Sequence, residues 1–366
     1  MFDNVYKDKK VLVTGHTGFK GTWLTAWLIK LGAKVVGISK DIPTSPSMFE
    51  ELKLENQITH YKEDIRNLDK MIEIIDAEKP DILFHLAAQP IVSTSYHDPI
   101  ETISSNVMGT ANILEALKVS NYKCTAIIIT SDKAYDNVEQ VWGYKEDDKM
   151  GGKDIYSGSK GAAELIIKSY YNSFFKSNDC NVKLAIGRAG NVIGGGDWAK
   201  DRIVVDCMEA WNEKRSVEIR SPEATRPWQH VLEPLSGYLN LGQLLYHNHD
   251  LNGEDFNFGP RAEQNHSVKQ LLEDLSKYWN FECVNQAFTI TDNIPFHEAG
   301  LLKLNCDKSL FYLQWQANME YRDTIRLTSE WYYDFYNSDN DILEKTIDQI
   351  CEYERMAEEK GLLWTV

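Results

Sequence analysis

The sequence lacks paired cysteines and long apolar runs. No two cysteines form a Cys-x-x-Cys pair, so neither a zinc site nor a disulfide framework is expected, and reduced thiols are the default. No apolar run approaches the roughly 20 residues of a membrane helix, and the start of the chain does not have the pattern of a secretion signal. We therefore expect a soluble, cytoplasmic protein without membrane contact. The six cysteines are Cys124, Cys180, Cys207, Cys283, Cys306 and Cys351.

The sequence also lacks positive charge, because 39 lysines and arginines stand against 55 acidic residues. The net charge of -16 argues against a nucleic-acid partner, which needs a basic surface. It does not exclude a phosphorylated ligand, since a few local arginines suffice to bind one. The sequence has no internal repeat or low-complexity segment, and its 366 residues, 43% of them apolar, can form one large domain or two associated ones.

A glycine-rich turn follows the first predicted strand, residues 9–14. The turn reads Gly15-His16-Thr17-Gly18-Phe19-Lys20-Gly21, and a helix pattern runs over residues 22–31 to Gly32. A strand, a glycine turn and a helix in this order allow a pyrophosphate to approach the backbone at a helix N-terminus. The spacing is Gly-x-x-Gly-x-x-Gly, which differs from the Gly-x-Gly-x-x-Gly dehydrogenase fingerprint.

Asp41 follows the second predicted strand, residues 34–39, and lies twenty residues after Gly21. An acid in this place can accept hydrogen bonds from an adenosine ribose and repel a 2′-phosphate, which favours NAD over NADP. The neighbouring Lys40 instead favours NADP, because its positive charge can bind the 2′-phosphate. Asp41 can alternatively begin the turn 41–43.

Two further segments are expected near a dinucleotide. Asp64, followed by Ile65, either meets the adenine or caps a helix over residues 68–75. The next strand, residues 81–85, leads into small residues from Leu86 to Ala88 that let the backbone pass close to a cofactor. His85 lies within an apolar run, which favours a packed, hydrogen-bonded histidine over a catalytic one.

Three polar residues, Ser131-Asp132-Lys133, end a strongly apolar strand that covers residues 124–130 and follows a predicted helix over residues 100–119. In a parallel sheet, ligands lie beyond the carboxyl ends of the strands, so these side chains are placed where a substrate is expected. Ordinary solvation of a strand end is the alternative.

Tyr156 and Lys160 are four residues apart at the start of a predicted helix over residues 156–175, so they share one face. A cation about 4 Å from a phenol stabilises the phenolate by roughly 4 kcal/mol at an effective dielectric of about 20. That lowers the pKa of the phenol toward neutrality and predicts a base that takes a proton from a substrate hydroxyl. Such a pair also occurs on many helices by chance.

The alternation of strands and helices through a strand at 182–188 predicts a Rossmann-like α/β fold, a doubly wound parallel sheet with right-handed crossovers. A glycine-rich loop, 190–198, is followed by a predicted helix at 201–211, a strand at 216–220 and a loop at 225–231. Arg202, Arg220 and Arg226 either bind a diphosphate or form surface ion pairs.

The rest of the chain predicts a smaller, mainly helical part. A helix at 232–246 and a strand at 255–260 return to the sheet, so residues 1–188 with 230–260 are expected to bind the dinucleotide, and 189–229 with 261–366 the substrate. His247 and His249 lack a third ligand, and no metal site is expected. The remaining predicted helices cover residues 267–279, 307–313, 321–336 and 341–360.

With these motifs in place, the chain resembles the extended short-chain dehydrogenase/reductases that modify nucleotide sugars. The resemblance runs nearly end to end and is most specific in four motifs. Within that family, the four motifs together are similar to those of 4,6-dehydratases that act on CDP-linked glucose, and the last two, which are long, carry the most information. The motifs are Gly-His-Thr-Gly-Phe-Lys-Gly (15–21), Ser-Asp-Lys-Ala-Tyr-Asp-Asn (131–137), Arg-Ala-Gly-Asn-Val-Ile-Gly-Gly-Gly-Asp-Trp-Ala (188–199) and Arg-Pro-Trp-Gln-His-Val-Leu-Glu-Pro-Leu-Ser-Gly-Tyr-Leu (226–239).

The resemblance implies a closed hydride cycle on a nucleotide sugar. Tyr156 removes the C4 hydroxyl proton while hydride passes to NAD, Ser131 binds the same oxygen, and Lys160 holds the nicotinamide ribose. Water is then lost across C5 and C6, and the hydride returns to C6. Asp132 is the candidate acid at the C6 hydroxyl and Lys133 the candidate base at C5, with pKa values shifted by burial, although the two adjacent residues can share the proton.

The resemblance also implies the binding residues and a homodimer formed through helices 100–119 and 156–175. Rival interpretations keep the fold: a 4-epimerase or a dehydratase of another nucleotide sugar, or a non-catalytic protein that senses a dinucleotide. The predicted NAD contacts are Gly15, Thr17, Gly18, Phe19, Gly21, Asp41, Asp64, Ile65, Leu86, Ala87, Tyr156 and Lys160, and those of the CDP-glucose substrate are Gln89, Asn191, Arg202 and Arg226.

Overall fold

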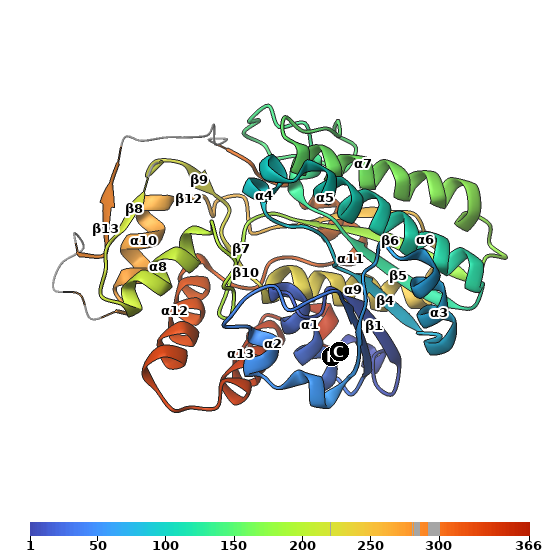
Figure 1. The fold of residues 1–366 in the computed structure, drawn as a ribbon, viewed down its shortest axis with the longest axis horizontal. Helices are drawn as coiled ribbons and strands as arrows, with labels where there is room; N and C mark the ends of the chain where they lie inside the picture. Colours follow the sequence, from blue (N-terminus) through green and yellow to red (C-terminus); the bar gives the residue numbers. More distant parts are fainter. Residues whose placement is uncertain (220, 280, 282–285, 292–300) are drawn as a thin grey trace.

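The computed structural model describes residues 1–219, 221–279, 281, 286–291 and 301–366. Figure 1 shows two parts side by side: a sheet covered by helices on both faces, and a smaller part with α8, α10 and α12. Arg220 and Cys283, which the sequence interpretation used, lie outside the described residues.

The central sheet has seven strands in the order β11-β6-β5-β4-β1-β2-β3, and all of them pair in parallel. The order reverses between β1 and β4, which is the switch point where a doubly wound sheet binds its ligand. The predicted fold class is therefore confirmed. The strands are β1 (Lys10–Thr14), β2 (Lys34–Ser39), β3 (Thr59–Lys62), β4 (Ile82–His85), β5 (Cys124–Ile129), β6 (Val182–Ala189) and β11 (Asp255–Phe258).

The sheet strands are apolar on both faces because helices cover both faces. In β1, Val11 and Val13 pack into one core layer with Trp23 of α1, whereas Leu12 packs into the other layer with Ile74 and Leu114. The helices of the sheet region are α1 (Phe19–Lys30), α3 (Leu68–Glu78), α4 (Val92–His97), α5 (Pro99–Ile103), α6 (Gly109–Ser120), α7 (Ile155–Tyr170) and α9 (Leu232–His247).

Two predicted helices differ from the structure in a way that affects the site. The helix at 22–31 begins earlier, at Phe19, so the last glycine of the turn lies inside its first turn. The helix at 100–119 is interrupted by a π-helical turn, Ser104–Met108, between α5 and α6. A single uninterrupted helix was therefore the wrong expectation.

The smaller part surrounds three short strand pairs. β7 (Val192–Ile193) pairs with β10 (Gln229–His230), β8 (Val217–Ile219) with β13 (Phe288–Ile290), and β9 (Thr225–Arg226) with β12 (His266–Ser267). Residues 225–231 were predicted as a loop, but β9 and β10 lie within them. The remaining helices are α2 (Met48–Glu51), α8 (Ile203–Asn212), α10 (Val268–Ser276), α11 (Asp307–Leu313), α12 (Tyr321–Asn337) and α13 (Ile342–Glu359).

The last long helix, α13, packs on the sheet part. Glu354 accepts a hydrogen bond of 2.8 Å from the Trp27 indole of α1 and pairs with Lys30 at 2.5 Å. Tyr353 and Trp364 belong to the same core layer as α1 and α9. The predicted division assigned 261–366 to the substrate-binding part, whereas these contacts join the C-terminal residues to the sheet part.

Candidate active site

The glycine turn closes tightly against the end of β4. Gly15 has a φ of 74°, and a Cβ atom there would lie 2.8 Å from the Cα of Ala87. At Gly21 a Cβ atom would lie 2.1 Å from the Gly15 carbonyl oxygen. Only glycine fits either place, and Gly18 precedes the first turn of α1, whose amides lack partners within the helix. This cradle fits the pyrophosphate of a dinucleotide.

The end of β4 is fixed by a buried hydrogen-bonded chain. Thr14 Oγ1 accepts from the amide of Ala87 at 3.2 Å and lies 2.7 Å from His85 Nδ1, while His85 Nε2 lies 3.1 Å from Thr110 Oγ1. Burial, with the charge of Lys160, lowers the pKa of His85 to about 3. The prediction of a packed, hydrogen-bonded histidine is confirmed.

The residues expected at the adenosine ribose lie beside the turn. Thr17 donates to the backbone carbonyl of Asp41 at 2.7 Å, which holds the exposed Asp41 side chain next to the cradle. Lys40, the argument for NADP, pairs with Glu101 at 2.9 Å. The charge of Lys40 is neutralised by Glu101 and is not directed at a 2′-phosphate, so this arrangement supports the prediction of NAD.

Asp64 binds Arg66 rather than the end of a helix. Its carboxylate accepts from Arg66 Nε at 3.0 Å and from the Arg66 amide at 2.9 Å, and the guanidinium holds its pKa below the usual range. The N-cap of α3 is Asn67, whose side chain accepts from the Lys70 amide at 3.3 Å. The alternative that Asp64 caps this helix is wrong, and its contact with adenine remains a prediction, as does that of the buried Ile65.

The three polar residues after β5 form a short turn. Ser131 Oγ donates to Asp132 Oδ1 at 3.0 Å and accepts from the Lys133 amide at 3.2 Å. Asp132 is 4% exposed. Burial raises its pKa, and the charges of Lys133 and Lys20 oppose that rise. The expected rise for this carboxyl is confirmed, and Lys133 is half-buried beside it.

Tyr156 and Lys160 are both buried at the start of α7, whose N-cap Asp154 accepts from the Ser157 amide at 2.9 Å. Burial raises the pKa of Tyr156 to about 12, although Ser131 and Arg202 favour the phenolate. The expected lowering of this pKa toward neutrality is therefore wrong in this structure. Its ammonium lies 6.0 Å from the centroid of the phenol ring, and burial outweighs the charges around the oxygen.

Lys160 itself is perturbed by the same environment. Burial lowers its pKa to about 8, while the carboxylate of Glu164, one turn further along α7, opposes the shift. The ammonium is therefore close to its titration point at slightly alkaline pH.

Asn106, in the π-helical turn, connects the β4 loop with α7. Its Oδ1 accepts from the Gln89 amide at 2.8 Å, and its Nδ2 donates to Ser159 Oγ at 2.9 Å. Both ends of the Gln89 side-chain amide bind nearby groups, Thr102 Oγ1 and the backbone of Ile91. The substrate contact of Gln89 remains a prediction. An asparagine in the middle of an apolar helix pattern was the only sequence signal for this junction.

A buried network of ion pairs joins β6, β11 and α7 next to the site. Arg188 of β6 is fully buried and binds Glu164 through Nε at 2.7 Å and Nη2 at 2.9 Å, and it also pairs with Asp255 of β11. Thr130 donates to the same Glu164 at 2.5 Å. Because Thr130 precedes Ser131 and Glu164 lies one turn after Lys160, the network fixes the strand end relative to α7.

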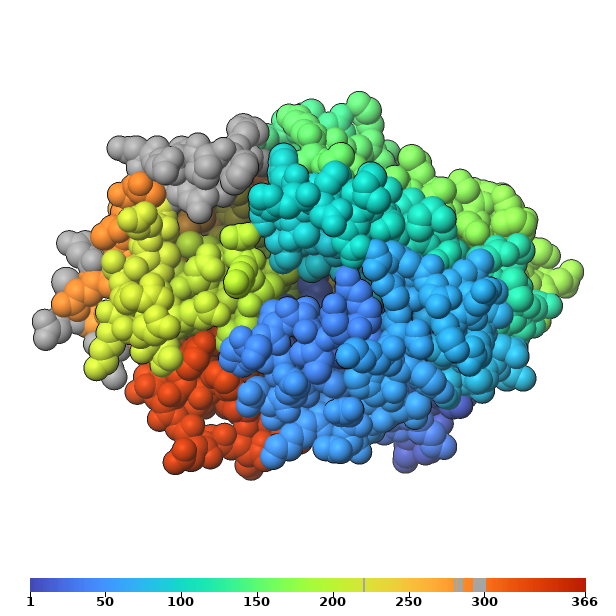
Figure 2. Space-filling view, in the orientation of Figure 1, coloured from blue at the N-terminus to red at the C-terminus, as the bar shows by residue number. Residues whose placement is uncertain are grey.

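The loop that follows β6 approaches Asp132 from the other side. A Cβ atom at Gly190 would lie 2.8 Å from Asp132 Oδ2, and further along the loop Asp197 pairs with Arg202. The predicted diphosphate ligands Arg202 and Asn191 thus belong to one segment beside the turn 131–133. Figure 2 shows the surface hollowed where this yellow-green segment meets the blue and teal segments of the sheet part.

Arg226, the other predicted diphosphate ligand, lies in β9, where its Nη1 donates to the carbonyl of Thr225 at 2.8 Å. A small pocket that includes Gly190, Gln229 and Lys303 adjoins the turn 131–133 at Gly190. The contacts of the substrate with Asn191, Arg202 and Arg226 remain predictions.

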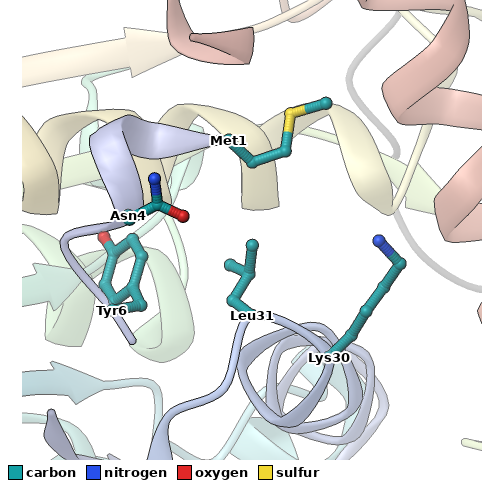
Figure 3. Close-up of a pocket in the computed structure, with 5 residues that line it drawn as sticks. All are labelled: Met1, Asn4, Tyr6, Lys30 and Leu31. Atoms are coloured by element: carbon teal, nitrogen blue, oxygen red, sulfur yellow. The ribbon is translucent and has the colours of Figure 1, made fainter. Parts of the chain in front are cut away.

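A second pocket lies away from these residues. Figure 3 shows that Met1, Asn4, Tyr6, Lys30 and Leu31 line it. Lys30 ends α1, whereas the glycine turn precedes the other end of this helix, so the pocket contains none of the predicted site residues.

The described ranges offer no alternative metal, membrane or disulfide chemistry. No group of three histidine, cysteine or acidic side chains is arranged to hold a metal ion. No helix there has the length and apolar character required to span a bilayer. The cysteines of this part of the chain, Cys124, Cys180, Cys207, Cys306 and Cys351, are free.

Comparison with known proteins decides the family. The profile of the GDP-mannose 4,6-dehydratase family matches residues 12–326. The chain belongs to this family. It is 46% identical over 335 residues to the CDP-glucose 4,6-dehydratase of Salmonella typhimurium, covering 90% of this chain and 92% of that protein. The dTDP-glucose 4,6-dehydratase of Haemophilus influenzae is 24% identical, with 88% of this chain and 97% of that protein covered.

Solved structures agree with this family fold. A dTDP-glucose 4,6-dehydratase from Bacillus anthracis, in complex with NAD, matches with a TM-score of 0.73 at 17% identity, covering 89% of this chain and 97% of that one. A UDP-glucose 4-epimerase from Thermotoga maritima, with UDP-glucose, has a TM-score of 0.75 at 21% identity, covering 89% and 99%. The predicted resemblance to extended short-chain dehydrogenase/reductases is confirmed.

Proposed function

We propose that this chain is an NAD-dependent hydro-lyase that converts CDP-glucose to CDP-4-keto-6-deoxyglucose. The observation that carries the proposal is the buried Asp132, with a raised pKa, between Ser131 and Lys133. An elimination needs an acid and a base at neighbouring carbons, which a simple epimerisation does not. The 46% identity to a CDP-glucose 4,6-dehydratase over nearly the whole chain supports both the reaction and the nucleotide.

The first step is oxidation at C4. NAD, when bound in the glycine cradle, supplies a hydride acceptor at C4 and later a hydride donor at C6. Tyr156 takes the proton from the C4 hydroxyl, and Ser131 donates a hydrogen bond to the same oxygen. Lys160, buried one turn further along α7, holds the nicotinamide ribose and places a positive charge near the phenol.

The second step is loss of water across C5 and C6. The new 4-keto group acidifies the C5 proton, which Lys133 removes, while Asp132 protonates the departing C6 hydroxyl. The burial that raises the pKa of Asp132 keeps a proton available for this transfer. Lys133 is half-buried, so its ammonium is in reach of both the site and solvent.

The proposal is tested by incubating the purified protein with CDP-glucose. A 4-keto sugar absorbs strongly in the near ultraviolet in base, and we expect this signal without net accumulation of reduced cofactor. Accumulating reduced cofactor would indicate a simple dehydrogenase, and a C4 epimer without keto product an epimerase. Parallel reactions with UDP-, dTDP- and GDP-glucose determine the nucleotide preference. Absence of product from all four substrates, with NAD bound, would favour a sensor.

We also propose a homodimer and a cytoplasmic location. Large apolar side chains are exposed on adjacent helices of one side of the sheet part, where Figure 1 shows α5, α6 and α7 together. Among them, Ile100 is 71% exposed and Leu165 58%. A second copy of the chain that covers these side chains would remove the apolar surface of both helices from water. The free cysteines of the described residues are consistent with a reducing compartment.

A further inference from the structure

Lys20 is a lysine within the glycine turn motif, and neither the fold nor the cradle requires it. The backbone of this turn serves the dinucleotide, and any residue can supply an amide there. Lys20 is half-buried in the first turn of α1, and among the described residues none forms an ion pair with its ammonium. A cation held in a partly buried place without a partner is a candidate for binding an anion.

The direction of the side chain follows from its neighbours on α1. Trp23 lies three residues after Lys20, on the same helix face. Its indole donates to the carbonyl of Gly195 at 2.9 Å, and the ring of Phe19 would lie 3.3 Å from a Cβ atom at Gly194. This face of α1 therefore packs on the loop that runs from Gly190, beside Asp132, to the ion pair of Asp197 and Arg202.

The charges that act on Lys20 give its place within this region. After burial, Arg202 has the largest effect on its pKa, followed by Asp132, Lys160 and Asp197, and the sum lowers the pKa to about 8. Two like charges, Lys20 and Arg202, are thus held near each other, and among the described residues Asp197 is the one carboxylate that pairs with Arg202. Such a convergence of cations is stabilised when an anion binds between them.

We propose that Lys20 is a substrate-binding residue whose ammonium binds the phosphoryl group next to the sugar of a nucleoside diphosphate sugar. The inference rests on the proposed function and deepens it. The charges of Arg202, the expected diphosphate ligand, and of Asp132, the proposed acid at the sugar, both act on Lys20. A cation there fixes the point where diphosphate and sugar join, and this places C4 and C6 against Tyr156 and Asp132.

The test compares nucleotide binding by Lys20→Met, which keeps the length of the side chain and removes its charge, and by Lys20→Arg, which keeps the charge. The NAD-loaded protein is titrated calorimetrically with CDP and with CMP, which lacks the second phosphoryl group. For Lys20→Met we expect affinity for CDP to fall by about tenfold to a hundredfold, with affinity for CMP and for NAD unchanged. Lys20→Arg should recover most of the loss.

Lys30→Met is the matched control, because Lys30 lies at the other end of α1 and pairs with Glu354. It should change neither nucleotide affinity, and the melting temperatures of all variants establish that they are folded. Equal losses for CDP and CMP, a loss of NAD affinity, or unchanged CDP affinity in Lys20→Met would each overturn the proposal.

The failure of the proposed function is recognised separately, in the unmodified protein. If that protein forms keto product only from another nucleoside diphosphate glucose, the comparison is made with the diphosphate and monophosphate of that base. The assignment of Lys20 is then tested by the same comparison: Lys20→Met should lose affinity for the diphosphate and keep affinity for the monophosphate. If the unmodified protein binds no nucleoside diphosphate at all, both proposals are wrong.

Discussion

Tyr156 must lose a proton in a place where burial keeps that proton bound. Its pKa is raised to about 12, so the phenol is protonated at neutral pH in this structure, even with Ser131 and Arg202 favouring the anion. The rate of oxidation should therefore rise with pH below this value, since the fraction of phenolate increases about tenfold per pH unit. Lys160 sets an opposing limit, because its charge is lost as pH rises through about 8.

Tyr156→Phe removes the proton acceptor without changing the shape of the site. We expect oxidation at C4 to fall by roughly a hundredfold to ten-thousandfold. Binding of NAD and of CDP should be retained, because α7 keeps its cap and its packing. Rapid-mixing measurement of reduced cofactor in a single turnover checks the rate, and calorimetry checks binding. A variant that still oxidises the sugar at the wild-type rate would exclude Tyr156 as the base.

Lys133→Ala separates the two chemical steps. Because Lys133 is the proposed base at C5 and is less buried than Ser131 and Asp132, hydride transfer from C4 should continue while elimination stalls. Reduced cofactor should then accumulate transiently, and keto-deoxy product should fall by about a hundredfold or more. Quenched samples taken during one turnover show both quantities. Equal loss of oxidation and elimination would remove the assigned role of Lys133.

Among the elements, those with strong local patterns could be predicted from the sequence. The strand at 34–39 and the helix at 307–313 are found with the same bounds, because their apolar spacing and their ends are local signals. The two-residue strands β9 and β10 could not be predicted, since they exist only through pairing with distant segments. The π-helical turn at 104–108 likewise depends on what Asn106 binds across the fold.

Some features of the candidate site could likewise be predicted from the sequence, and others could not. The strand-end turn 131–133 and the pair Tyr156 and Lys160 follow from position relative to strands and helices, which the sequence pattern contains. The pKa of Tyr156 does not follow, because burial by residues remote in sequence outweighs its neighbour on the helix. Lys20 could not be predicted as a site residue, because the sequence motif that contains it was interpreted through its glycines alone. The direction of its side chain follows from the packing of α1 against the 190–198 loop.

The start of α9 contains a titratable link to the C-terminal region. Glu233 is buried, accepts from the Asn318 amide at 2.9 Å and from the Tyr353 hydroxyl at 2.9 Å, and has its pKa raised to about 7 by burial. The folded state therefore binds this proton more tightly than the unfolded chain. The resulting stabilisation is complete below about pH 4.5 and is lost as pH rises through about 7.

Glu233→Gln should remove this dependence. Between about pH 4.5 and 7, the free energy of unfolding of the variant should rise relative to wild type by at most about 1.4 kcal/mol per pH unit. Denaturant titrations across this range measure the difference. Glu73→Gln, at an exposed side chain on α3, is the control and should follow the wild type. A constant difference between Glu233→Gln and wild type would show that Glu233 has no raised pKa.

At the scale of the whole molecule, the apolar surface of α5, α6 and α7 predicts the oligomeric state. Ile100→Lys with Leu165→Lys places charges on the exposed face of two of these helices, and we expect a monomer, whereas the wild type should be a dimer by light scattering. Leu310→Lys, at a 51% exposed apolar residue of α11, is the matched control and should stay dimeric. A monomeric wild type, or a dimer in the double variant, would place the interface elsewhere.

The buried network around Arg188 has a consequence for how the protein tolerates substitution. Arg188 pairs with Glu164 and with Asp255, which also pairs with Lys168 and Lys308, so the loss of Arg188 or Glu164 leaves an opposite charge in the interior with fewer partners. Free energies of substitution at these positions should not add, and a second change can compensate for a first. Lys133 and Lys20 are half-buried and lie outside this ion network, so a change at either leaves no unpaired charge within it. Single substitutions at the half-buried residues can therefore alter substrate binding, whereas a substitution within the ion network requires a second, compensating substitution.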